Sequence, residues 1–206
     1  MRNTLLLTIG FAALGTMFIA QAGPPLICHP YNIGAAKSLP WANGPNWDNP
    51  DPRYNVKNLA ADTLAILDQA PSVLVRMETM RRAVIYGGED HNAARELLAQ
   101  LKAREIAAEK SARPAATAYF DYGYFLSSLK QIEEWKYKED MTGGIDGYSF
   151  VQRALAIDPD SSEMHFAAAI MASSPPRPGE RDDHLRKARA AKNDVLLAQN
   201  LSTHFQ

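Results

Sequence analysis

The sequence predicts an all-α protein built from antiparallel helical hairpins (a short α-solenoid), preceded by an irregular N-terminal arm. Three observations predict this fold class. Beyond residue 56, apolar side chains recur at intervals of three and four residues, as they do on one face of an α-helix. No stretch alternates between apolar and polar residues in the way that a half-buried strand does. Residues 23–54 are instead dense in Pro, Gly and Asn, which break helices and favour turning or extended backbone.

The first 22 residues have the pattern of a removable export signal. Arg2 is a single early cation, residues 5–20 are predominantly apolar, and Ala20-Gln21-Ala22 places small residues at both positions that determine cleavage. The alternative is a membrane anchor, but the apolar run is shorter than the roughly 20 residues that a bilayer crossing needs. We therefore expect a mature chain that begins at Gly23, has no integral membrane segment, and works in the periplasm or outside the cell.

Composition excludes some partners. Removal of the signal from the 206-residue chain leaves 184 residues, enough for one domain or a short repeat array with an ample core. The chain has 22 basic and 23 acidic residues and a formal net charge of −1. This balance gives no electrostatic reason to expect nucleic acid or an anionic membrane surface as a partner.

Residues 23–55 form the predicted arm, and residues 56–206 form the predicted helical domain. The arm carries more apolar bulk than a free linker usually tolerates, so we expect it to lie against the helices. The residues that supply this bulk are Leu26, Ile27, Tyr31, Leu39, Trp41, Trp47 and Tyr54.

Breaks between the apolar stripes divide the helical domain into elements. Pro71 suits a first helical turn, Gly87-Gly88 can end a helix, and Asp90 can cap the next one. The first three helices carry the stripes Leu59, Thr63, Ile66 and Leu67; Val73, Met77, Met80 and Val84; and Ala94, Leu97, Leu98, Leu101 and Ala108. Later helices are expected over residues 115–137, 147–157, 161–173, 180–191 and 194–205, with a stiff Pro-rich turn over residues 174–179.

Two later segments are similar to each other at a fixed offset. Val151-Gln152-Arg153-Ala154 aligns with Leu185-Arg186-Lys187-Ala188, 34 residues further along, and Pro159 follows Ala154 after five residues. The period and the proline position resemble those of tetratricopeptide repeats, in one good hairpin and two degenerate ones. An irregular helical bundle is the alternative arrangement.

The chain departs from the tetratricopeptide pattern at two places. Gly123 and Ala154 are 31 residues apart, where the repeat has about 19, which implies an insertion of about 12 residues around positions 133–144. Arg81 and Gln100 also occupy positions at which the repeat has small residues.

The resemblance implies a binding function. Stacked hairpins leave a concave surface, lined by the first helix of each hairpin, that usually holds a peptide or protein segment. We therefore expect an exported, non-catalytic interaction module or scaffold with a protein or peptide partner. The repeat pattern places seven residues on the concave surface: Thr117, Phe120, Tyr124, Ser127, Glu163, Phe166 and Ile170. The alternative is that these residues are core, covered by the arm, and that the protein self-associates.

Cys28-His29 is the candidate for chemistry, because a thiol and an imidazole can form a nucleophile pair or bind a metal ion. The alternative function is therefore a secreted hydrolase or redox protein, with its site where this part of the arm meets the helices. Pro30 counts against a joint site of Cys28 and His29. The residue before a proline favours extended backbone, in which successive side chains point to opposite sides. As the single cysteine, Cys28 is a buried thiol, an intermolecular disulfide partner, or a reactive or metal-bound group.

No other motif indicates catalysis. The remaining histidines lack the close helical spacing of a zinc site, and there is no serine elbow, phosphate loop or dinucleotide fingerprint. The start of the arm resembles that of some uncharacterised exported bacterial proteins, which implies no activity. We expect neither a cofactor nor a metal ion.

Overall fold

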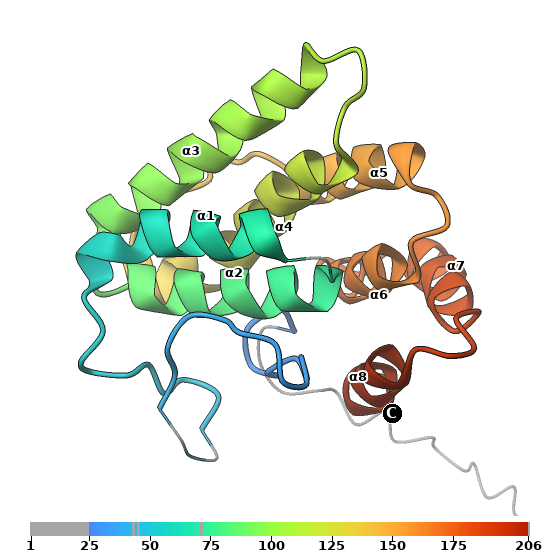
Figure 1. The fold of residues 1–206 in the computed structure, drawn as a ribbon, viewed down its shortest axis with the longest axis horizontal. Helices are drawn as coiled ribbons and strands as arrows, with labels where there is room; N and C mark the ends of the chain where they lie inside the picture. The colour runs from blue at the N-terminus through green and yellow to red at the C-terminus, as the bar shows by residue number, and fades with distance from the viewer. Residues whose placement is uncertain (1–24, 43, 45, 71, 206) are drawn as a thin grey trace, which may run out of the picture.

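The computed structural model describes residues 25–205 except residues 43, 45 and 71. The predicted export signal and Pro71 lie outside the described residues. Within them the regular structure is helical, with isolated bridges and no strand, which confirms the all-α fold class (Figure 1). The elements are η1 (Val56–Asn58), α1 (Leu59–Gln69), α2 (Val73–Gly87), α3 (His91–Glu109), α4 (Ala116–Ile132), η2 (Glu133–Tyr137), α5 (Gly147–Ile157), α6 (Ser162–Met171), α7 (Pro178–Ala188) and α8 (Val195–His204).

Local sequence signals set the helix ends. The side chain of Asp90 accepts hydrogen bonds from the amides of Asn92 and Ala93, and α2 ends at Gly87 as its glycine pair predicts. Four further helices begin with the same kind of side-chain cap, at Ser72, Asp146, Ser161 and Asp194.

The helix expected over residues 115–137 divides into two parts. Its regular part, α4, ends at Ile132 and continues as the π-helical turn η2. Lys138 then takes a left-handed conformation with φ of 57°, which ends the helix. The turn allows the buried hydroxyl of Tyr137 to donate to the carbonyl of Val84 at 2.6 Å. The helix thus ends at a residue that contacts α2.

The consecutive helices α4–α5 and α6–α7 pair extensively as hairpins, α1 packs on α2 and α3, and α3 packs on α4 as well as on α2. Across the hairpins, α2 contacts α4 and α6, and α6 contacts α8. The sides of α2, α4, α6 and α8 that face the arm are called the inner face below. In Figure 1 the arm, drawn in blue, runs beneath α2 toward α8. The arm thus packs on the helices, as its apolar residues predict.

Two glycines allow α4 and α5 to cross closely. A Cβ atom on Gly123 would lie 2.4 Å from the carbonyl oxygen of Gly147, and one on Gly147 would lie 2.2 Å from that of Gly123. Each of these contacts is to backbone, which cannot move aside as a flexible side chain can. The α4–α5 hairpin therefore requires residues without a side chain at its crossing point.

We predict that Gly123→Ala lowers the free energy of unfolding by about 1–3 kcal/mol, because it forces the two helices apart. Urea denaturation followed by circular dichroism measures the change. Gly179→Ala is the matched control, since a Cβ atom there meets nothing within 4 Å. In α7 this change is expected to stabilise the protein by about 0.5–1 kcal/mol. Equal effects of the two substitutions would contradict the close crossing.

Candidate functional site

One arm residue, Tyr31, contacts all four helices of the inner face. Its amide donates to Glu78 of α2 at 3.0 Å, and its hydroxyl accepts from Tyr124 of α4 at 2.8 Å. Its ring lies edge-on to Phe166 of α6 and is stacked on His204 of α8, with centroids 4.8 Å apart. Only 3% of Tyr31 is exposed. These four contacting residues are called the Tyr31 site below.

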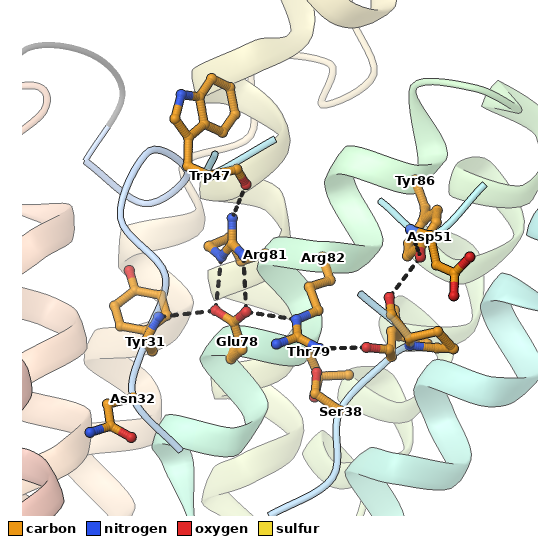
Figure 2. A network of polar contacts seen from close by, with 12 residues as sticks. Tyr31, Asn32, Ser38, Trp47, Asp51, Glu78, Thr79, Arg81, Arg82 and Tyr86 are labelled. Atoms are coloured by element: carbon orange, nitrogen blue, oxygen red, sulfur yellow. Dashed lines mark hydrogen bonds and ion pairs between the residues drawn. The ribbon is translucent and has the colours of Figure 1, made fainter. Parts of the chain in front are cut away.

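A buried charge cluster on α2 holds the arm at this point (Figure 2). The carboxylate of Glu78 accepts from Arg81 at 2.8 and 2.9 Å and from Arg82 at 2.7 Å. Arg81 also donates to the carbonyl oxygens of Ile27 and Trp47, at 3.1 and 3.0 Å. Glu78 and Arg81 are fully buried. Their ion pairs are therefore completed by main-chain oxygens of the arm.

Other side chains of the inner face also bind the main chain of the arm. Asn200 accepts from the amide of Asn32 and donates to the carbonyl of the same residue, both at 2.9 Å. Gln131 accepts from the amide of Leu26 at 2.8 Å. Main-chain groups are common to all polypeptides, so these contacts do not depend on the arm sequence.

Apolar arm side chains fill the space between these polar contacts. Leu26, Ile27 and Leu39 are fully buried in the core. Arg82 donates to the carbonyl oxygen of Leu39, and Tyr86 donates to that of Pro40 at 2.6 Å. The helices thus bind the arm as a groove binds a peptide, with polar groups on its main chain and apolar contacts on its side chains.

The structure brings three of the seven residues predicted for the concave surface together at the arm. Tyr124 and Phe166 contact Tyr31, and Phe120 stacks on Tyr124 with ring centroids 5.4 Å apart. All three side chains are fully buried, as is nearly all of Ile170, and Thr117 is half-buried. In this structure the aromatic residues line a groove that the arm already fills.

Two of the predicted residues lie elsewhere. The carboxylate of Glu163 accepts from the hydroxyl and amide groups of Ser72 and Val73, so it fastens α6 to the start of α2. Ser127 lines a cleft of about 800 Å³ between α4, the start of α5 and the turn after α6, next to the first described residues of the arm. Tyr148 and Arg177 also line this cleft, with the guanidinium 4.5 Å from the centre of the tyrosine ring.

Sequence reasoning missed the polar half of the site. Glu78, Arg81, Arg82 and Asn200 bind the arm, and none of them was among the predicted site residues. One signal was present: Arg81 stands where the repeat pattern has a small residue. A charged side chain at a core position needs a buried partner, and here that partner is Glu78.

Cys28 and His29 are both half-buried where the arm crosses the helices. Burial raises the pKa of the Cys28 thiol and lowers the pKa of His29, so both groups favour their neutral forms. Neither shift favours the activated thiolate on which nucleophilic catalysis depends. Among the described residues, no group of three or more His, Cys, Asp or Glu side chains is placed to hold a metal ion.

A pair of histidines, His165 and His184, joins α5, α6 and α7 through hydrogen bonds. The carbonyl of Pro159 can only accept, so Nε2 of His165 donates to it at 3.0 Å. Nδ1 of His165 then accepts from Nδ1 of His184 at 2.8 Å, and Nε2 of His184 accepts from the hydroxyl of Tyr148 at 2.9 Å. This assignment satisfies the chain with both rings neutral, and burial lowers the pKa of both. We interpret it as a structural link between the last two hairpins.

Comparison of the chain with models of protein families, with curated proteins and with solved structures gives no match. The resemblance to tetratricopeptide repeats therefore rests on the residues quoted above. In the part of the chain that the structure describes, no helix combines the length and apolar character needed to cross a bilayer. The function has to be inferred from the inner face itself.

We predict that acid weakens the contact between the arm and α8 through His204. The pKa of His204 is lowered to about 4, mainly by burial and also by His29 and Arg81, with Glu78 acting in the opposite direction. Since a free imidazole titrates near 6.5, the unfolded chain binds more protons below that pH. The stability contributed by neutral His204 is therefore complete above about pH 6.5 and is lost as the pH falls toward 4, by up to about 3 kcal/mol.

The measurement is urea unfolding at pH 7 and at pH 4, with His204→Phe as the control. Phenylalanine keeps a ring that can stack on Tyr31 but does not titrate, and every other ionisable group is common to both proteins. The wild type is expected to lose about 2–3 kcal/mol more than His204→Phe over this interval. The same loss in both proteins would contradict the role of His204.

Proposed function

We propose that the protein is an exported, non-catalytic binding module whose inner face binds an extended polypeptide segment. One observation carries this proposal: the inner face already binds such a segment, its own arm. Asn200, Gln131 and Glu78 bind amide or carbonyl groups of the arm that any polypeptide could supply. The tetratricopeptide resemblance supports the same function, because such repeats bind peptides on this surface.

The arm acts in this proposal as an intramolecular ligand. Because it is tethered to α1 through residues 48–58, its effective concentration at the inner face is high. An external segment must therefore compete with the arm, and binding strengthens whenever the arm is weakened. The partner is another protein or a second copy of this chain. The pattern of residues 1–22 supports a place of action in the periplasm or outside the cell.

If the arm competes with an added peptide, a variant with a weakened arm is expected to bind that peptide more tightly. A labelled peptide with the sequence of residues 25–41, with serine in place of Cys28, is titrated into the full mature chain and followed by fluorescence anisotropy. Tyr31→Ala removes the central anchor of the arm and changes no residue of the helices. We expect this variant to bind the peptide at least about tenfold more tightly than the wild type does.

A change in the peptide tests whether the peptide occupies the inner face, because a substitution of Asn200 would weaken the tethered arm and the peptide alike. N-methylation of the Asn32 amide in the peptide removes its hydrogen bond to Asn200, and this peptide is expected to bind Tyr31→Ala about tenfold more weakly than the unmodified peptide does. N-methylation at the exposed Ala35 is the matched control and is expected to change nothing. Absence of peptide binding by a folded Tyr31→Ala protein would contradict the proposal.

A further inference from the structure

We infer that the inner face selects a segment with an unmodified tyrosine, preceded four and five positions earlier by two aliphatic residues. This inference rests on the proposed function and names its ligand class. Tyr124 and His204 are the residues that make the selection. The argument follows from how the Tyr31 site encloses its occupant.

The first step is the shape of the site. His204 stacks on one face of the Tyr31 ring, at an interplanar angle of 12°. Phe166 stands edge-on to the same ring, at 87° and a centroid distance of 6.1 Å. These two contacts fix both the plane and the position of the ring, so the site fits a flat aromatic side chain.

The second step distinguishes tyrosine from phenylalanine. The hydroxyl of Tyr124 donates to the hydroxyl oxygen of Tyr31, and Tyr124 is itself fully buried. A phenylalanine in the site would deprive this buried donor of its acceptor. Sites built to hydrogen-bond a hydroxyl discriminate strongly against the analogue that lacks it, because a buried polar group is left unpaired.

The third step excludes a phosphorylated tyrosine. The Tyr31 hydroxyl lies inside the protein, and the nearby cation Arg81 already donates to Glu78, Ile27 and Trp47. A phosphoryl group would therefore be buried with no free cation to pair with it. Burial of an unpaired charge is strongly unfavourable.

The fourth step sets the spacing. Leu26 and Ile27 are both fully buried, whereas Pro30, directly before the tyrosine, is exposed. Gln131 holds the amide of Leu26, and Arg81 holds the carbonyl of Ile27. The two aliphatic side chains are thus fixed relative to the Tyr31 site, and the three residues between them and the tyrosine are less restricted.

The first experiment uses small probes on full-length Tyr31→Ala. This substitution removes the atoms of one phenol molecule, so the vacated site is titrated calorimetrically with phenol and with benzene. We expect phenol to bind at least about tenfold more tightly than benzene, and neither to bind the wild type. Adding Tyr124→Phe is expected to abolish this preference while benzene still binds. Equal affinities for phenol and benzene in Tyr31→Ala would overturn the inference.

The second experiment separates this inference from the proposed function. Peptides of residues 25–41 with tyrosine, phenylalanine or phosphotyrosine at position 31 are titrated into Tyr31→Ala. The tyrosine peptide is expected to bind at least about tenfold more tightly than the phenylalanine peptide, and the phosphotyrosine peptide not detectably. Equal binding of all three would overturn the selection and leave the proposed function standing. If phenol is preferred but no peptide binds, the proposed function fails and the hydroxyl-selective site remains.

If Tyr31→Ala does not fold, the conservative variant Tyr31→Phe carries the test. Hydrogen exchange of the amides of residues 26–39 is expected to be at least about tenfold faster than in the wild type, with α3 and α7 unchanged. Unchanged exchange in the arm would overturn the inference.

Discussion

The buried carboxylate of Glu78 joins the arm to the helices. Burial alone would raise its pKa, but ion pairs with Arg81 and Arg82 and the amide of Tyr31 lower it below its usual value. Such a cluster is stable only where every remaining donor has a partner, and Arg81 finds its last partners in carbonyls of the arm. The arm and α2 therefore depend on each other, because carbonyl groups of the arm take the place of the water molecules that would hydrogen-bond to Arg81 if it were exposed.

The contacts between the helices and the arm are of two kinds, and each contributes differently to recognition. Polar side chains of α2, α4 and α8 hold main-chain groups, which contributes affinity without regard to sequence. The Tyr31 site holds one aromatic side chain through stacking and a buried hydroxyl pair, which contributes specificity. Peptide-binding proteins commonly combine these two elements. Because the arm supplies both here, occupancy of the inner face is a competition between a tethered segment and a free one.

The packing of α4 connects the core of the molecule to this site. Gly123 faces α5 at the close helix crossing, and its neighbour Tyr124 faces the arm about 100° further around the helix. The crossing thus fixes the rotation of α4 that places the Tyr124 hydroxyl against Tyr31. A substitution at the crossing is therefore expected to act on the binding site, although Gly123 contacts α5 and not the arm.

Local sequence patterns predicted the all-α fold, caps such as that of Asp90, and the span of α5. Each follows from residues a few positions apart or from a repeat pattern. Two features emerge only in the folded chain: the arm fills the inner face, and Arg81 pairs with Glu78 beneath it. The reason is distance along the chain: Tyr31 and Glu78 are 47 residues apart, Asn32 and Asn200 are 168 apart, and no local pattern records which of them meet.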